Sequence, residues 1–589
     1  MQGTLVLIVG PSGAGKDTLI DGARGALSSN SKFVFVKRTI TRPSSSTGED
    51  HDTISVNEFE QREKKGEYFL SWEAHGLKYG IPSTCLNDLL AGRNVIANVS
   101  RNVITKALKG FSKVMVIEIT ASPRTLATRL RNRARETSTE IQSRLKRETS
   151  VIPRNAVKVT IINDNSPENG IKAFLSTLRM LQTSANTLIQ NKISGSSLNY
   201  IGYKRTISEI LANRFDDQHV KNFLVAITET LTRKETVHLA RARAEFSDYI
   251  NWETELVVDK HSMGGVPGSR ITLIVIPIVA AYGMTIPKTS SRAITSAAGT
   301  ADAMEVLARV DLDRDDVLRV VRKTSGCIAW NGRLNHSRID TLMNKITRPL
   351  RLDSLKWSVA SILSKKLTAG ITHCTIDIPL GPFAKVKTQS DANKLKDLFH
   401  YVGESLGLIL NVKITNGLIP VGKGIGPALE ARDAVAVLKN TPDAPSDLRK
   451  KALEFASAII GFNSAISSVE AETLANNLLD TGKAWDTFSE ICAEQGPPPQ
   501  PIKIGAYSIT VEADTTGTLD TINCFHLAGI ARESGAPLDK GAGIDLFARV
   551  GENITQGQPL YRIYSSSEQA LNNVQARVKQ NSAFNIITE

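Results

Sequence analysis

A glycine-rich loop near the N-terminus constrains the fold of this chain most strongly. The residues TLVLIVGPSGAGKDTLIDGARGAL at 4–27 combine a β-branched apolar segment, a loop with Lys16 and an amphipathic segment. This order of strand, loop and helix is the setting that a Walker A phosphate loop requires. Its glycines let backbone N–H groups approach phosphate oxygens, and its lysine reaches the β- and γ-phosphates. The pattern therefore predicts a nucleotide-binding domain, with a structural glycine turn as the alternative.

The predicted ATP-binding residues are continuous. One position departs from the Walker A pattern, because Asp17 stands where Ser or Thr normally contacts Mg2+. Either the Asp17 carboxylate approaches the ion or Thr18 takes its place. We therefore expect ATP and Mg2+ as cofactors, with Asp17 as the metal-site residue. The ATP-binding set is Gly10, Pro11, Ser12, Gly13, Ala14, Gly15, Lys16 and Asp17.

Apolar, β-rich segments recur through the same region and alternate with helical patterns. This alternation predicts an α/β fold with a parallel sheet covered on both faces. The segments lie at 4–9, 33–36, 95–99, 114–119 and 158–163.

The positive charge of the chain is concentrated in this first part. Residues 1–183 hold 27 basic and 17 acidic side chains, a net charge of +10, against +13 for the whole chain. The segment RLRNRARETSTEIQSRLKR at 129–147 places Arg131 and Arg135 four residues apart on a helix. Such a segment can be a lid that closes over the polyphosphate of a nucleotide, a solvated helix or a surface that binds nucleic acid. No aromatic residues are interleaved with it, which argues against stacking on bases and favours the lid.

A second set of polar residues predicts the site of the phosphoryl acceptor. Arg38 and Arg42 in RTITRPSSSTGEDH at 38–51 can hold phosphates that the acceptor already bears. Asp50 or His51 can act near the attacking oxygen, although a loop His beside acids is also often solvated.

These motifs, with SWEAHGLKYGIP at 71–82 and NVSR at 98–101, resemble the ribose 1,5-bisphosphate phosphokinases. Members of that family are related to guanylate kinase and make 5-phosphoribosyl 1-diphosphate, and GKD in place of GKS or GKT is typical of them. The resemblance covers about residues 3–180 and implies a P-loop kinase. Phosphorylation of GMP is the nearest rival activity.

The stretch 258–302 contains two further loops suited to an anion. VDKHSMGGVPGSR comes before the apolar segment ITLIVIPIVAAYG, and IPKTSSRAITSAAGTAD follows it. Lysine, hydroxyl groups and glycine backbone N–H groups converge on oxyanions, whereas no cluster of acids for a metal is present. A Ser/Gly-rich turn is the alternative interpretation.

This stretch resembles the thymidine and pyrimidine-nucleoside phosphorylase family, and more closely its AMP phosphorylase-like branch. The resemblance continues through TRPLRLDSLKWSVASILSKKLTAG at 347–370, DIPLGPFAKVKT at 377–388, PVGKGIGPALEARD at 420–433 and GAPLDKGAGIDL at 535–546. It implies phosphorolysis of a glycosidic bond, a small helical lobe, a large α/β lobe and a C-terminal α+β domain. A kinase stands where the branch usually has a small N-terminal domain.

The resemblance also implies roles for individual residues. Asp353 is expected to be the general acid, with His261 as the other catalytic candidate. No arginine matches the one that thymidine phosphorylases use for the pyrimidine, so the base stays open. The expected phosphate-binding residues are Lys260, Ser262, Gly265, Ser290 and Thr300, and the expected substrate-binding residues are Ser291, Arg292, Ala293, Ile294, Thr295, Ser296, Ser361, Lys365 and Lys385.

The predicted domain organisation follows from composition and from both resemblances. The serine-rich polar segment LQTSANTLIQNKISGSSLNY suggests a linker between two enzymes. We expect a kinase at 1–183, a linker at 184–200, a helical lobe at 201–254, an α/β lobe with a return segment to the helical lobe at 255–440, a helical connection at 441–500 and an α+β domain at 501–589.

Composition limits the cellular setting. No run of about 18 apolar residues is present, and TLVLIVG is too short for the apolar region of a signal peptide. Five widely spaced cysteines without a CxxC pair fit reduced thiols in the cytoplasm. The expected partners are small-molecule nucleotides, nucleosides and sugar phosphates, not nucleic acid or membrane. A homodimer through the helical lobe is expected from the phosphorylase resemblance.

Together the two halves predict a bifunctional enzyme. The second half is expected to cleave a pyrimidine nucleoside or a nucleoside 5'-monophosphate with phosphate, giving free base and (deoxy)ribose 1-phosphate or ribose 1,5-bisphosphate. Ribose 1,5-bisphosphate is the acceptor of the kinase that the first half resembles. ATP would then convert it to 5-phosphoribosyl 1-diphosphate. The alternative is a thymidine phosphorylase fused to a kinase or to a silent guanylate-kinase-like binding module.

Overall fold

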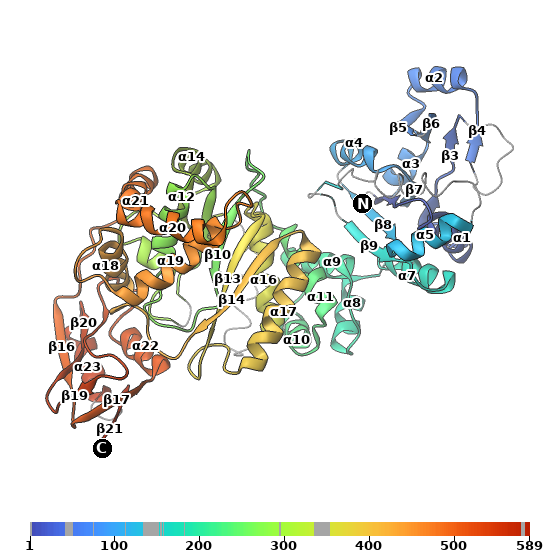
Figure 1. Ribbon diagram of the computed structural model, residues 1–589. Coiled ribbons are helices and arrows are strands. Elements are labelled where there is room, and N and C mark those ends of the chain that lie inside the picture. The colour runs from blue at the N-terminus through green and yellow to red at the C-terminus, as the bar shows by residue number, and fades with distance from the viewer. Residues whose placement is uncertain are drawn as a thin grey trace. The chain divides into compact units, whose positions relative to one another are not determined.

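The computed structural model has two compact units, Met1–Ser184 and Ala185–Glu589, and each is described by itself. Figure 1 shows the first unit in blue to cyan and the second in green to red. The described residues are 3–41, 51–74, 76–111, 113–132, 152–153, 156, 158–181, 183–293, 296–334, 354–578 and 583–588.

The first unit is built on a five-stranded parallel sheet in the order β2-β7-β1-β8-β9. All residues of the central strand β1 are fully buried, as expected where helices cover both faces of a parallel sheet. This confirms the α/β prediction and the five predicted strands. The strands are β1 (Leu5–Val9), β2 (Phe33–Phe35), β7 (Asn94–Asn98), β8 (Val114–Thr120) and β9 (Lys158–Ile162), and the helices are α1 (Lys16–Ala26), α3 (Cys85–Leu90), α4 (Ile104–Gly110), α5 (Pro123–Asn132) and α7 (Pro167–Arg179).

A smaller mixed sheet of the same unit has the order β4-β3-β6-β5. It contains β3 (Arg38–Ile40), β4 (His51–Thr53), β5 (Tyr68–Ala74) and β6 (Leu77–Pro82), and the helix α2 (Val56–Lys64) follows β4. The predicted acceptor residues Arg38 and His51 lie in this sheet. They are direct partners in the parallel pairing of β3 and β4.

The second unit begins with a helical lobe, as predicted. The structure differs from the prediction in the segment expected to be a linker, because 185–193 forms the helix α8. Leu188, Ile189 and Lys192 are buried on one face of it, while its exposed Asn and Gln residues gave the sequence a linker-like composition. The helices of the lobe are α8 (Ala185–Ile193), α9 (Tyr200–Leu211), α10 (Asp217–Thr230) and α11 (Arg233–Ala244).

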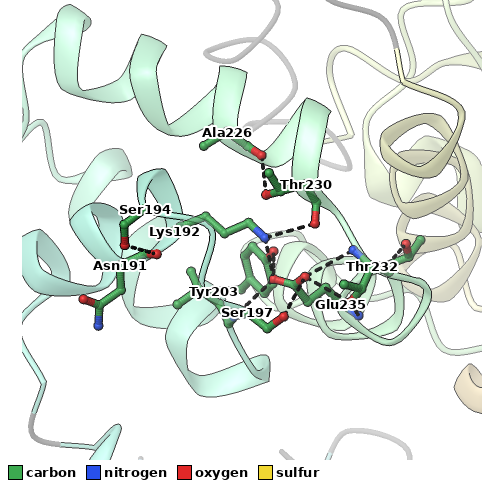
Figure 2. Close-up of polar contacts among 11 residues, drawn as sticks. Asn191, Lys192, Ser194, Ser197, Tyr203, Ala226, Thr230, Thr232 and Glu235 are labelled. Carbon is green, nitrogen blue, oxygen red and sulfur yellow. Dashed lines mark hydrogen bonds and ion pairs between the residues drawn. The ribbon is translucent and has the colours of Figure 1, made fainter.

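One buried carboxylate fastens α8 to the rest of the lobe, as Figure 2 shows. The Glu235 side chain accepts hydrogen bonds from Lys192 Nζ at 2.8 Å, Tyr203 OH at 2.9 Å and the Leu198 N–H at 2.8 Å. Ser197 Oγ and the Thr232 N–H donate to its other oxygen at 3.3 and 3.1 Å. Residues 185–199 are therefore a structural part of the second unit.

The α/β lobe contains two parallel groups of strands, β10-β13-β14 and β11-β12. The apolar segment after the first loop forms the helix α12. Every residue at 272–280 is buried, so the helix has no polar face that would reveal a helical period in the sequence. The strands are β10 (Val258–Ser262), β11 (Ile286–Ser290), β12 (Gly326–Trp330), β13 (His373–Leu380) and β14 (Ile409–Asn416), and the helices are α12 (Thr272–Ala281), α13 (Thr300–Met304), α14 (Arg314–Thr324), α16 (Leu355–Thr368), α17 (Gln389–Leu406) and α18 (Pro427–Leu438).

Three helices and a C-terminal α+β domain complete the unit. The helices α19 (Ser446–Ile460), α20 (Ser468–Asp480) and α21 (Lys483–Gln495) share one apolar core with α12. The domain has sheets β15-β18-β20-β16 and β19-β17-β21. Its elements are β15 (Gly424–Ile425), β16 (Tyr507–Glu512), β17 (Gly517–Ile522), α22 (Cys524–Glu533), β18 (Gly543–Leu546), β19 (Asn553–Ile554), β20 (Pro559–Ser565), α23 (Glu568–Val578) and β21 (Phe584–Ile587).

Within the described ranges, none of the helices has the length and apolarity needed to cross a membrane.

Candidate functional sites

The glycine loop of the first unit has the backbone that its sequence predicts. Gly10, Gly13 and Gly15 adopt φ angles of 149°, 86° and 86°, which favour glycine. A Cβ on Gly10 would lie 1.9 Å from the carbonyl oxygen of Ile119 on β8, so the loop passes tightly over the sheet. Lys16 Nζ donates to the carbonyl oxygens of Gly10 at 2.5 Å and of Pro11 at 3.0 Å. The loop and its lysine therefore form one closed turn at the start of α1.

Asn98 links this loop to the predicted acceptor region. Its side-chain amide donates to Asp17 Oδ1 at 3.0 Å, and its carbonyl oxygen accepts from Arg38 Nη1 at 3.0 Å. The Arg38 guanidinium also lies over the ring of Tyr79, 5.6 Å from its centroid. Asn98 belongs to the NVSR motif, but the sequence offered no sign that it would join these two residues.

The arginine-rich segment contributes one residue to the loop within the described ranges. Arg129 Nη1 is buried and has no hydrogen-bond partner among the residues that the structure describes, and it lies 3.9 Å from the position that a Cβ on Gly15 would take. Asn163 supports the same loop by donating to the Ala14 carbonyl oxygen at 2.8 Å. Four other predicted residues of this region have side chains outside the description, namely Arg42, Asp50, Arg131 and Arg135.

In the second unit, two of the predicted phosphate residues, Ser262 and Ser290, end parallel strands, the edge at which α/β sheets bind ligands. Lys260 and Ser262 are on β10, and Ser290 ends β11. Ser262 Oγ donates to Asp377 Oδ2 on β13 at 2.8 Å and accepts from the Gly264 N–H at 3.2 Å. The hydroxyl is thus fixed at the start of the KHSMGG loop.

The loop after β10 packs closely on the loop after β13. Gly265 has a φ of 99°, and a Cβ there would lie 3.0 Å from the backbone nitrogen of Lys385. The structure therefore brings Gly265 and Lys385 together, although 120 residues separate them in the sequence. A larger residue at 265 would push the two loops apart.

The loop after β11 is held by charged side chains from other segments. Asp302 Oδ2 accepts from the N–H groups of Ala293 at 2.7 Å and Gly299 at 2.9 Å. Its Oδ1 accepts from Lys540 Nζ of the C-terminal domain at 2.6 Å. Thr300 Oγ1 accepts from Arg270 Nη1 at 3.2 Å. Asp302, Arg270 and Lys540 thus position this loop.

Other predicted substrate residues of this loop have partners within the protein. Arg292 makes a two-pronged ion pair with Glu305, with distances of 2.5 and 2.6 Å, and lies over Trp330. Ser296 Oγ donates to the Ala298 carbonyl oxygen at 2.9 Å, and the Ser291 carbonyl oxygen accepts from the Ala301 N–H at 3.4 Å. Ile294 and Thr295 lie outside the described residues.

Burial lowers the pKa values of Lys260 and His261, the first two residues of the loop sequence KHSMGG. It lowers the pKa of Lys260, whose exposed fraction is 3%, to about 7. Burial, together with the charges of Lys366, Lys288 and Lys260, holds the pKa of His261 well below its usual range. His261 is therefore neutral near pH 7 and can form hydrogen bonds but cannot act as a charged acid. Asp353, the other catalytic candidate, lies outside the described residues.

The helix α16 presents the two remaining predicted substrate residues, Ser361 and Lys365, one turn apart. Neither is fully exposed. Desolvation, together with the charges of Arg243 and Lys366, lowers the pKa of Lys365 to about 7. A half-buried lysine with a lowered pKa differs from the solvated lysine that an exposed stripe of a helix would present.

No group of three or more His, Cys, Asp or Glu side chains in the described part of the chain is arranged to hold a metal ion. The five cysteines are free thiols.

Three family models match the chain. The guanylate kinase model matches residues 2–179, the a/b domain of the glycosyl transferase family matches 254–485, and the C-terminal domain of pyrimidine nucleoside phosphorylase matches 518–585. These matches follow the order of the domains in the structure.

Relatives match across both units. A bifunctional ribose 1,5-bisphosphokinase-thymidine phosphorylase of Cupriavidus necator is 48% identical over 98% of this chain and 97% of its own length. A protein of the same description from Azorhizobium caulinodans is 42% identical over 96% and 94%. A putative thymidine phosphorylase of Rhodopseudomonas palustris is 43% identical over 68% of this chain and 77% of its own. The chain therefore belongs to the family of bifunctional ribose 1,5-bisphosphokinase-thymidine phosphorylases, which join a guanylate-kinase-type domain to a pyrimidine nucleoside phosphorylase.

Proposed function

We propose that the chain catalyses two consecutive reactions. The second unit cleaves a nucleoside 5'-monophosphate with inorganic phosphate, giving free base and ribose 1,5-bisphosphate. The first unit transfers the γ-phosphoryl group of ATP to that product and forms 5-phosphoribosyl 1-diphosphate. The observation that carries the proposal is the fusion itself, because a kinase domain of this kind is joined to the phosphorylase that can supply its acceptor.

In the phosphorolysis, the loops after β10 and β11 hold inorganic phosphate against the anomeric carbon. Lys260 supplies charge, and the hydroxyls of Ser262, Ser290 and Thr300 supply hydrogen bonds. Because the sugar becomes positively charged in the transition state, a dianion held beside it lowers the barrier. Neutral His261 can donate a hydrogen bond to the departing base, and Asp353 is the proposed proton donor.

In the kinase reaction, the loop from Gly10 to Asp17 binds the phosphates of ATP. Asp17 fits a Mg2+ ion chemically, since a carboxylate oxygen is a hard ligand and Asn98 orients the group. The ion would neutralise charge on the β- and γ-phosphates. Arg129, whose buried Nη1 lies beside the loop, would bind a phosphate oxygen of ATP, and Arg38 would bind a phosphate of the acceptor.

Base release from a panel of nucleotides and nucleosides tests the first reaction. AMP, CMP, GMP, UMP, uridine and thymidine are each incubated with phosphate, and free base is measured by chromatography. The proposal expects faster release from a 5'-monophosphate than from its nucleoside. Release from thymidine alone would contradict it.

The loop lysine tests the second reaction. Lys16→Ala should abolish ATP-dependent formation of 5-phosphoribosyl 1-diphosphate from added ribose 1,5-bisphosphate and leave base release unchanged. Equal kinase rates in this variant and the wild type would show that the glycine loop is not the site of phosphoryl transfer.

Thymidine phosphorolysis is the second candidate for the phosphorylase unit. It is favoured by the description of the full-length relatives as thymidine phosphorylases. In that case the product is 2-deoxyribose 1-phosphate, and the first unit is an independent kinase or a silent binding module. The same panel distinguishes the two candidates.

The enzyme acts on small molecules. We further propose a cytoplasmic homodimer that associates through the helical lobe. Sedimentation of the full chain, and of a variant with charged substitutions on exposed positions of α10, tests the dimer.

A further inference from the structure

Asn98 ends the strand β7, which lies beside the strand that leads into the glycine loop of the first unit. In the parallel pairing of β1 and β7, Asn98 is the partner of Ile8, and the loop begins just after it at Gly10. The loop in turn leads to Lys16 and Asp17 at the start of α1. Because ligands bind at the carboxyl ends of parallel strands, Asn98 lies at the edge where the kinase reaction is proposed to occur.

Asn98 contacts one residue from each of the two proposed substrate sites. Its side-chain amide donates a hydrogen bond to Asp17 Oδ1 at 3.0 Å, and its main-chain carbonyl oxygen accepts one from Arg38 Nη1 at 3.0 Å. Asp17 belongs to the loop proposed for ATP, and Arg38 lies in the sheet proposed for the acceptor. Asn98 therefore joins the two sites through different atoms, a side-chain nitrogen and a main-chain oxygen.

The contact with Asp17 concerns the residue that is proposed to approach Mg2+. P-loop enzymes usually hold this ion with a Ser or Thr hydroxyl of the loop and with a carboxylate from another segment. In this chain the loop itself carries the carboxylate, and the neighbouring strand ends in a neutral amide. A hydrogen bond to a carboxylate fixes its orientation, which is the usual role of a group that supports a metal ligand.

We propose that Asn98 is a positioning residue of the kinase unit. Its side chain orients Asp17 toward the Mg2+ ion that accompanies ATP, and its carbonyl oxygen holds Arg38 for the acceptor. Two contacts on one residue thus set the placement of the phosphoryl donor relative to the acceptor. This inference rests on the proposed kinase reaction, and no contact between Asn98 and the ion or either substrate is part of it.

Asn98→Ala separates the two contacts in the full-length protein, because it removes the side-chain amide and keeps the carbonyl oxygen. Calorimetric titration with the non-hydrolysable analogue β,γ-imido-ATP, once with Mg2+ and once with EDTA, gives the factor by which Mg2+ tightens binding. This factor should be about tenfold smaller in the variant, as expected when the support of a metal ligand is lost. An unchanged factor, or a wild-type protein whose affinity does not respond to Mg2+, would overturn the proposal.

The acceptor gives a readout that a general loss of structure would also move. Because Arg38 is bound by the main chain, the Michaelis constant for ribose 1,5-bisphosphate should change by less than about twofold in Asn98→Ala. The Mg2+ concentration that gives half of the maximal rate should rise about tenfold. Equal rises in both values would mean that the substitution disturbs the whole site, and the proposed role would then be wrong.

Asn94→Ala is the matched control. Asn94 begins the same strand, and its side chain accepts a hydrogen bond from the Thr4 N–H at 3.1 Å, at the end of β7 opposite to Asn98. The substitution should lower the melting temperature and leave the effect of Mg2+ on binding unchanged. A tenfold smaller effect in this variant would show that any weakening of β7 has the same result, which would also overturn the proposal.

Asp17→Asn shows whether Asn98 acts through Asp17. It should remove most of the tightening by Mg2+, and adding Asn98→Ala should then have no further effect, since the two residues act as one unit. A further tenfold loss in the double variant would mean that Asn98 contacts the ion itself, contrary to the proposal. Wild-type protein that binds the analogue with Mg2+ but forms no 5-phosphoribosyl 1-diphosphate contradicts the proposed function, whereas an unchanged response to Mg2+ in every variant that folds contradicts the role of Asn98.

Discussion

Two clusters of buried lysines in the second unit differ in the balance of their charges. In the helical lobe, Lys192 faces Glu235, and neutral donors satisfy the rest of the carboxylate (Figure 2). In the α/β lobe, Lys288 and Lys366 share the single carboxylate of Asp259. The first cluster joins helices, and the second lies beneath two glycine-rich loops.

The difference separates a structural use of buried charge from a functional one. Burial alone would raise the pKa of the Glu235 carboxyl group. Hydrogen bonds from Lys192, Leu198 and Thr232 nevertheless hold this pKa below its usual range. In the other cluster burial lowers the pKa of Lys288 to about 8, a sign that its charge is incompletely compensated. A balanced pair specifies packing, whereas an unbalanced cluster beside two glycine-rich loops fits the phosphate site that we propose there.

The largest effect is expected from replacing Lys260, which lies beside the unbalanced cluster and leads into the glycine-rich loop after β10. Lys260→Ala should lower kcat/KM for phosphorolysis about a thousandfold, because a buried cation that stabilises the reacting anion is lost. Steady-state measurement of base release gives the value. Kinase activity, assayed in the same preparation, should not change, and a parallel loss of both activities would point to misfolding instead.

Substitutions in the balanced cluster of Lys192 and Glu235 should change the stability of the second unit but not its catalytic activity. Glu235→Gln leaves Lys192 buried without an anion and should destabilise the second unit by about 3 kcal/mol. Denaturant unfolding followed by tryptophan fluorescence measures this, since Trp252, Trp330, Trp357 and Trp485 all belong to that unit. Lys192→Met with Glu235→Gln removes both charges and should recover part of the loss. Stability equal to the wild type in the single variant would show that the network contributes nothing.

A rise in pH should lower the affinity for phosphate and raise the stability of the second unit. Lys260 and Lys288 have pKa values of about 7 and 8 in the folded state, below the ordinary value of 10.5. As the pH rises from 7 to 9 they lose protons, so phosphate affinity should fall several-fold.

Over the same range the unfolded chain binds more protons than the folded one, so stability should rise with pH from these two groups. Lys260→Arg keeps its charge and should flatten the affinity profile. Phosphate affinity that does not vary between pH 7 and 9 in the wild type would contradict the unbalanced cluster.

The smallest effect is expected at the edge of the site. Lys540→Met removes the ion pair that the C-terminal domain makes with Asp302, but the side chain of Lys540 is 18% exposed and Asp302 keeps two backbone hydrogen bonds. The constant for phosphate should therefore rise only about threefold. A loss as large as that of Lys260→Ala would mean that Lys540 contacts the phosphate itself.

Local patterns in the sequence predicted the parts of the fold that depend on local chemistry. The five strands of the first unit followed from β-branched runs, and the loop from Gly10 to Lys16 followed from glycine spacing. The helix α12 could not be distinguished from a strand, because it is buried on all sides and lacks a polar face. The helix α8 was missed because its exposed residues resemble a linker.

The loops of the candidate sites could be predicted from the sequence, but the ion pairs and hydrogen bonds that connect separate elements could not. Lys260, Ser262 and Gly265 stand in one motif, so their proximity follows from the chain. Asp259, Lys288 and Lys366 come from three elements, and only the tertiary fold shows that they meet. The lysine in IPKTSS was not among the predicted site residues. Its burial and its ion pair with Asp259 are visible only in the structure.

Phosphorus NMR of one reaction mixture shows whether the two units catalyse consecutive reactions. Full-length protein is supplied with a nucleoside 5'-monophosphate, inorganic phosphate, ATP and Mg2+, and the products are followed over time. We expect ribose 1,5-bisphosphate to appear first and 5-phosphoribosyl 1-diphosphate to follow, and we expect the Lys16→Ala variant to stop at the first product. If no 5'-monophosphate is consumed while thymidine yields 2-deoxyribose 1-phosphate, the two units do not act in sequence.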